Sequence, residues 1–126
     1  MNNKEFIKIL INAFPEIKED VLDEDNDGLI TLQIGYFKRF AQKAIDENNS
    51  GKIKKCFKFI DDTIGKVDSR LENAIYLSFL RKLDFDKNPN AKKILSKKML
   101  LAKNDLDRYD TSSGTNDKLN KFLNDL

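Results

Sequence analysis

The chain has 126 residues and no histidine, and this absence limits its chemistry more than any residue present. Imidazole is the commonest general base, the usual activator of Ser and Cys nucleophiles, and the commonest side-chain ligand of transition metals. The sequence also contains no HExxH, Walker A, GxGxxG or CxxC pattern. We therefore expect a protein that is not an enzyme and that needs no cofactor.

The sharpest local pattern is an acidic loop at residues 23–30, whose sequence DxDxDGxI matches the first half of an EF-hand calcium loop. The twelfth position of such a loop is normally a bidentate Glu. Here it is Ile34, which lies on the apolar stripe of the next predicted helix. Two interpretations stay open: a weak calcium site with Asp23, Asp25 and Asp27 as ligands, or an acidic turn stiffened by its Asn, Asp and Gly residues.

Residues 16–27 are strongly acidic, because they contain seven carboxylates and only one lysine, Lys18. The formal net charge of the whole chain is +2, so the remainder is neutral to basic. Such asymmetry would steer a basic protein partner towards one end of the molecule, although ordinary solubilising charge is the alternative. The candidate partner-binding residues are Glu16, Glu19, Asp20, Asp23, Glu24, Asp25 and Asp27.

Three other features suggest no chemistry of their own. The Lys-rich face of residues 92–103 has no aromatic residue to stack bases, so we expect a solvated helix face and no nucleic-acid partner. Cys56 lies on an apolar stripe, which predicts a buried thiol. No apolar run approaches the roughly 18 residues of a membrane span, and a polar segment follows Met1. We expect no membrane partner and a cytoplasmic location.

Helices must position these residues, because 40% apolar and 35% charged residues combine with only five Gly and two Pro. We predict an all-α fold, an irregular bundle of about six to seven short helices with mostly antiparallel neighbours. Helical spacing of apolar residues predicts helices at residues 2–14, 15–22, 31–48, 53–64 and 69–84, from residue 88 onward, and in a tail with Leu119, Phe122, Leu123 and Leu126 on one stripe.

Capping residues mark two of the helix starts. Asn2 and Glu5 have capping-box spacing, and so have Ser69 and Glu72. The helix that begins at Ser69 is apolar at nearly every position from 74 to 80, so we expect residues 69–84 to lie at the centre of the bundle. The apolar face expected for the first helix consists of Phe6, Ile9, Leu10 and Ala13.

The C-terminal part is expected to be a separate segment of the same domain. Residues 107–116 are rich in turn-forming types and predict a turn or linker. The expected division is a helical bundle domain at residues 1–106, followed by a linker and a docked amphipathic helix at residues 107–126. In the helix that begins near residue 88, Leu101 is expected to face inward and Lys103 outward.

The acidic loop ending in Asp27-Gly28, the pattern Tyr36-Phe37-x-x-Phe40 and the segment ENAIYLSFL at residues 72–80 resemble a group of small bacterial helical proteins. Some proteins of this kind look like immunity proteins, which bind and neutralise the cognate toxin of a polymorphic-toxin system. The resemblance covers residues 20–100 and rests on packing residues, so it implies a helical fold and transfers no catalytic residue. It implies that the acidic residues face a basic toxin domain.

Our first hypothesis is a non-enzymatic protein-binding protein, an immunity-like inhibitor of a bacterial toxin that acts through its acidic surface. One alternative is a small helical adaptor whose groove the C-terminal helix opens or closes. Another is a weak calcium-binding protein that uses the incomplete EF-hand-like loop.

Overall fold

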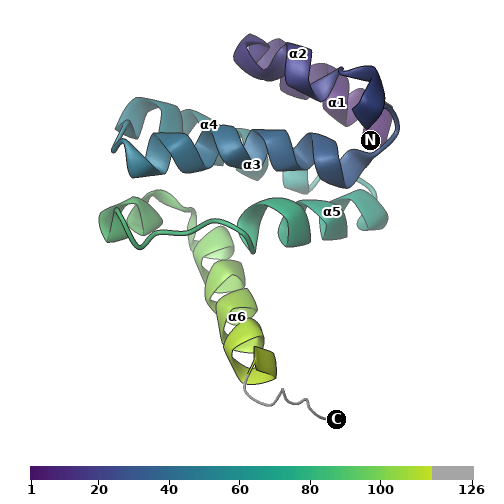
Figure 1. Cartoon of the computed structure of the whole chain (residues 1–126). Coiled ribbons are helices and arrows are strands. Elements are labelled where there is room, and N and C mark those ends of the chain that lie inside the picture. Colours follow the sequence, from purple (N-terminus) through teal and green to yellow (C-terminus); the bar gives the residue numbers. More distant parts are fainter. Residues whose placement is uncertain (115–126) are drawn as a thin grey trace. The chain divides into compact units, whose positions relative to one another are not determined.

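A computed structural model describes the backbone of residues 1–114 and the side chains of residues 1–109. Every regular element in this part is helical, which confirms the expected all-α bundle of short helices (Figure 1). None of these helices is both long enough and apolar enough to cross a membrane. The elements are α1 (Asn3–Ala13), η1 (Pro15–Ile17), α2 (Lys18–Val21), η2 (Glu24–Asn26), α3 (Ile30–Asp46), α4 (Ser50–Ile64), α5 (Ser69–Ile75), η3 (Tyr76–Leu80), η4 (Pro89–Ile94) and α6 (Lys97–Gly114).

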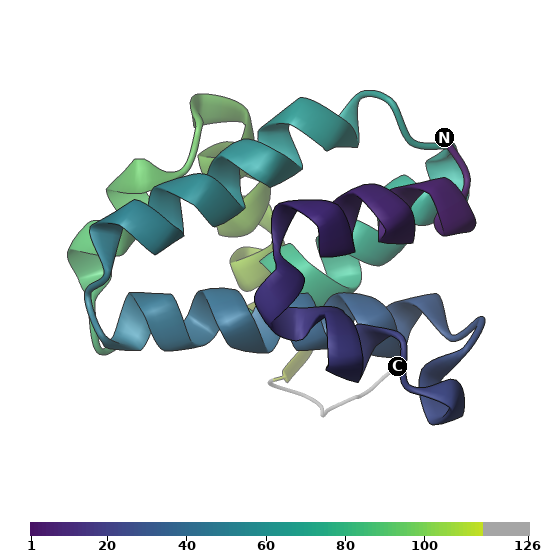
Figure 2. The ribbon, with the colours of Figure 1, turned by 90° about the horizontal axis from the view of Figure 1, so that it is seen from above.

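Residues 1–96 form one compact unit, and helix α3 lies at its centre. It packs against α2, α4 and α5 and against the short elements η1, η2 and η3. Helix α4 runs antiparallel to α3, as Figure 2 shows, in agreement with the expected arrangement of neighbours. The prediction that residues 69–84 occupy the centre is wrong, because Ala74, Tyr76 and Leu77 are only partly buried.

Phenylalanine rings join the elements of this unit. Phe14, Phe37 and Phe59 form a triangle with centroid distances of 5.0, 5.5 and 5.6 Å, and they come from the end of α1, from α3 and from α4. Phe79 of η3 stacks on Phe37 at 4.8 Å, and Phe6 of α1 contacts Phe59 at 5.9 Å. Ring pairs at such distances contribute roughly 0.5 to 1.5 kcal/mol each beyond the burial of their area. The cluster therefore holds α1, α3, α4 and η3 together.

Side-chain caps mark the starts of α1 and α5, and the cap of α5 lies one residue earlier than the sequence suggests. The capping box of α1 forms as predicted, because Asn2 Oδ1 accepts from the Glu5 N–H at 2.9 Å and Glu5 Oε1 accepts from the Asn2 N–H at 3.0 Å. Helix α5 is capped by Asp68, whose Oδ1 accepts from the Leu71 N–H at 2.8 Å. The prediction of Ser69 as the cap is wrong, because the carboxylate one residue earlier takes that hydrogen bond.

Two predicted helices end or divide earlier than expected. The helix from Ser69 changes into a π-helical turn at Tyr76–Leu80, closed by a hydrogen bond of 2.9 Å from the Arg81 N–H to the Tyr76 carbonyl, and it does not continue to residue 84. The helix expected from residue 88 is divided, because η4 is followed by Leu95 in an extended conformation (φ −59°, ψ 143°). Helix α6 begins only after this break.

Residues 97–114 belong to the second unit and form helix α6. The predicted turn or linker is wrong for residues 107–114, which continue the helix; the expected tail helix lies outside the described residues. Leu101 is 56% exposed and Lys103 only 3% exposed, whereas the sequence predicted a buried leucine and an exposed lysine. The ammonium of Lys103 tolerates burial because its Nζ lies 2.9 Å from Asp107 Oδ1.

The ring triangle predicts a large loss of stability on truncation of Phe37. We expect Phe37→Ala to lower the free energy of unfolding by about 3 to 5 kcal/mol, because it removes a fully buried ring that contacts three others. Urea unfolding measures this, with the milder Phe37→Leu variant as a fallback if the alanine variant does not fold. Leu32→Ala, at a side chain that is 50% exposed, is the control, and an equal loss there would contradict the prediction.

The capping geometry of α5 predicts different effects at adjacent residues. We expect Asp68→Ala to cost about 0.5 to 2 kcal/mol, because it removes the acceptor for the Leu71 N–H. Ser69→Ala is expected to stay within about 0.5 kcal/mol of the parent. Urea unfolding of the two variants decides the matter, and a larger loss for Ser69→Ala would place the cap where the sequence suggested.

Candidate functional site

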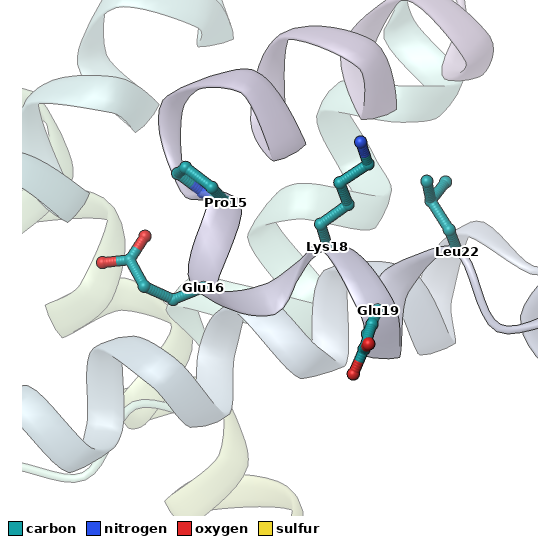
Figure 3. A pocket seen from close by; sticks show the side chains of 5 residues that line it. All are labelled: Pro15, Glu16, Lys18, Glu19 and Leu22. Carbon is teal, nitrogen blue, oxygen red and sulfur yellow. The ribbon is translucent and has the colours of Figure 1, made fainter.

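The seven predicted carboxylates are all exposed, but the structure does not bring all of them together. Glu16 lies towards α4, where its charge acts on Cys56 together with those of Lys52 and Lys55. Figure 3 shows Glu16 and Glu19 pointing away from each other on the segment that forms η1 and α2. The other six carboxylates lie within nine successive residues, are all exposed, and are called the acidic surface below: Glu19, Asp20, Asp23, Glu24, Asp25 and Asp27.

Local hydrogen bonds give the acidic loop a defined conformation. Asp23 Oδ1 accepts from the Asp25 N–H at 2.9 Å and caps η2. The amide of Asn26, only 6% exposed, donates to the Asp20 carbonyl at 2.8 Å and so ties η2 to α2. Gly28 then takes a left-handed conformation with φ of +75°, which glycine adopts without strain. The loop presents its carboxylates from a well-bonded backbone.

The same hydrogen bonds bear on the calcium hypothesis. In the part of the chain that the structure describes, no group of three or more Asp, Glu, Cys or His side chains is arranged to hold a metal ion. Asp23 already accepts a backbone hydrogen bond, and Ile34 is buried at 1% exposure on the core side of α3. This geometry adds no support for Asp23, Asp25 and Asp27 as metal ligands.

The carboxylates of the acidic surface have no ion-pair partner among residues 1–109, whose side chains the structure describes. The same is true of Glu16. Leu22, Leu29 and Leu32 lie in the same stretch of chain and are 48%, 48% and 50% exposed. Every large apolar side chain that is strongly exposed in residues 1–96 belongs to this trio. Exposed apolar side chains bordered by charge are typical of protein-binding surfaces.

A groove lies beside the acidic surface, between α1 and the segment that leads into α3. Its volume is about 470 Å³. The side chains of α1 that line it include Lys4 and Lys8, which lie outside the acidic stretch in the sequence. The full lining is Asn3, Lys4, Ile7, Lys8, Ile11, Leu22, Asp27, Gly28, Ile30 and Gln33.

A sequence signal for this groove exists on α1. Phe6 and Leu10, two residues of the expected core face, are fully buried. Ile7 and Ile11 are four residues apart and form a second apolar row, which does not belong to the expected core face. A second apolar row on a helix predicts a second packing surface, but only the fold shows that α2 and the start of α3 face it.

Cys56 is a buried thiol, as the apolar stripe predicted. It is fully buried, and this burial is the main reason why its pKa is raised from 9.0 to about 12, with smaller effects from Lys55, which lowers it, and Glu16, which raises it. A thiol that stays protonated in the physiological range is a poor nucleophile and a poor metal ligand. Cys56 therefore belongs to the core and not to a reactive site.

A family model matches residues 7–105, and its description is "Domain of unknown function (DUF7674)". The match covers most of the chain, which therefore belongs to this family. No curated protein and no solved structure is similar enough to the chain to give a match.

The raised pKa of Cys56 predicts a loss of stability in alkali. Between pH 9 and 12 the unfolded chain releases the thiol proton while the folded chain keeps it, so the free energy of unfolding should fall as the pH rises, by up to about 1.4 kcal/mol per pH unit. Urea unfolding at pH 8.5, 9.5 and 10.5 measures the slope. Cys56→Ala removes this contribution, so equal slopes for the variant and the parent would contradict the prediction.

Proposed function

We propose that the protein is a non-enzymatic binding protein, an immunity-like inhibitor that uses its acidic surface to bind a basic protein partner such as a bacterial toxin domain. The observation that carries this proposal is the coincidence, within residues 19–32, of six exposed carboxylates without ion pairs among the described residues and three exposed leucines. Unpaired surface charge speeds association with an oppositely charged partner, and apolar side chains released from water supply affinity.

The chemistry available in the chain also favours binding over catalysis. The chain has no histidine, and its one cysteine is buried with a raised pKa. The acidic loop is held by its own hydrogen bonds, including those from Asn26 and to Asp23, before any partner is present. A preformed surface loses little conformational entropy on binding, which suits a tight inhibitor.

The inhibitor hypothesis rests on charge complementarity and on the resemblance to immunity proteins described above. A toxin that cleaves nucleic acid needs a basic site for the phosphate backbone. An inhibitor that covers such a site benefits from carboxylates that face it. The acidic surface has the appropriate charge, and the adjacent Leu22, Leu29 and Leu32 offer apolar contacts at its border.

The test is a co-expression pull-down with the products of the genes adjacent to its own, repeated with Asp23→Asn, Asp25→Asn and Asp27→Asn combined. Asn keeps an acceptor oxygen for the Asp25 N–H, so the loop conformation should survive. At roughly 0.5 kcal/mol for each exposed charge pair, we expect the dissociation constant of the complex to rise about tenfold, and to rise with salt.

A matched control removes three charges from the other end of α3, with Asp46→Asn, Glu47→Gln and Asp86→Asn combined. Residues 30 and 46 of α3 are about 24 Å apart along the helix axis, and the loop that contains Asp86 is tied to the far end of the helix, where Asn88 donates to the Ile45 carbonyl. This variant should bind like the parent. Absence of any complex, or equal weakening by both triple variants, would argue against the proposal.

A further inference from the structure

The groove beside the acidic surface has a regular wall on α1. Ile7 and Ile11 lie four residues apart and form an apolar row, and Lys4 and Lys8 form a parallel row beside it. Ile7 is 7% exposed and Ile11 is partly exposed, while both lysines are exposed. One wall of the groove is therefore apolar at its base and basic at its rim.

The opposite wall comes from the segment that joins α2 to α3. Leu22 and Ile30 are its apolar residues, and Asp27 places a carboxylate on this side. The amide of Gln33 is held by a hydrogen bond of 3.1 Å from its Nε2 to the Val21 carbonyl, which fixes α2 against α3. At Gly28 the lining is bare backbone, with no atom within 4 Å of the position that a Cβ would take. This wall is therefore largely apolar, with an acidic rim at the exposed Asp27.

The two rims therefore have opposite charge. Neither Lys4 nor Lys8 forms an ion pair with a described residue, and neither does Asp27. A ligand that is basic on both sides would be repelled at the α1 rim, and one that is acidic on both sides would be repelled by Asp27 and the rest of the acidic surface. The groove is complementary to an apolar stripe with a basic flank and an acidic flank.

The secondary structure of the walls limits the form of such a ligand. The described part of the chain has no strand, so an extended peptide finds no sheet edge to extend, and recognition must use side chains. The α1 residues of the lining run from Asn3 to Ile11, about 12 Å along the helix, which matches about two turns of a second helix. Helices that lie in grooves bind by apolar side chains at spacings of three and four residues.

We propose that this groove binds a short amphipathic helix of the protein partner, with basic side chains on one flank of its apolar stripe and acidic side chains on the other. The inference rests on the proposed function and deepens it, because it names the element of the partner that is recognised. Leu22 and Ile11 contact the apolar stripe, Lys4 and Lys8 the acidic flank, and Asp27 the basic flank.

The first experiment uses a synthetic probe and needs no natural partner. The probe is a 12-residue helix-stapled peptide with Leu on one face, Lys on one flank and Glu on the other, added to the full chain labelled with ¹⁵N. We expect shifts in the amide resonances of the groove lining. We also expect binding about fivefold tighter than that of peptides with Lys on both flanks or Glu on both flanks. Absence of shifts, or equal binding of the three peptides, overturns the inference.

The second experiment uses variants of matched exposure in the captured complex and in the peptide titration. Leu22→Glu should weaken binding at least about tenfold, since a carboxylate would enter the apolar stripe. Leu32→Glu, at a side chain as exposed but outside the groove lining, is the control in the peptide titration only, where it should change the affinity less than about threefold. The double variant Lys4→Glu, Lys8→Glu should also weaken binding. If negative charge alone attracted a basic partner, the same double variant would instead strengthen binding.

The outcomes separate this inference from the proposed function. If a complex is captured and weakened by the Asp→Asn triple variant but not by the Leu22 or lysine variants, the groove assignment is wrong while the proposed function stands. If no neighbouring gene product binds but the mixed-flank peptide does, the groove assignment stands while the proposed function fails. If the chain forms dimers by sedimentation and Leu22→Glu removes them, a second copy occupies the groove and the partner assignment is overturned.

Discussion

The mutual contact of Phe14, Phe37 and Phe59 is the interaction on which the rest of residues 1–96 depends. Phe14 is the residue that ends α1 before Pro15, and its ring also contacts Phe40 at 5.6 Å and the ammonium of Lys55 at 4.9 Å. The turn after α1 is therefore anchored between α3 and α4. Because η1 and α2 follow this anchor directly, their position over α3 is set by the same ring, and with it the position of the groove and of the acidic surface.

The acidic surface and the groove depend on this core for their position. Two side-chain amides complete the anchoring that Phe14 begins: Gln33 bonds to the carbonyl of Val21, and Asn26 bonds to that of Asp20. Both amides are almost fully buried, so their hydrogen bonds replace those that water would make; they hold α2 on α3 and η2 on α2. The carboxylates of the acidic surface and the three leucines can remain exposed, because these buried hydrogen bonds fix the backbone that carries them. A binding surface of this kind gains affinity from being preformed.

Part of the core and of the candidate site could be predicted from spacing along the chain, and part could not. Apolar spacing identified Ile34, Phe37 and Cys56 as core residues, since helical periodicity acts over a few residues. It missed Phe59, which lies off the main stripe of α4 yet contacts three other rings. It also missed Gln33, whose burial is tolerated only because a carbonyl of another element accepts its proton.

The sequence by itself determined the helical class, most helix starts, the absence of histidine chemistry and the exposure of the acidic stretch, because these depend on residue types and on neighbours within one or two helical turns. Only the tertiary structure decided which charged side chains lie near one another. It separated Glu16 from the other carboxylates and turned it towards α4, and it placed Lys4 and Lys8 of α1 across a groove from Asp27. The path of the chain between distant elements sets these relations, and the ring cluster in the core sets that path, which no local spacing encodes.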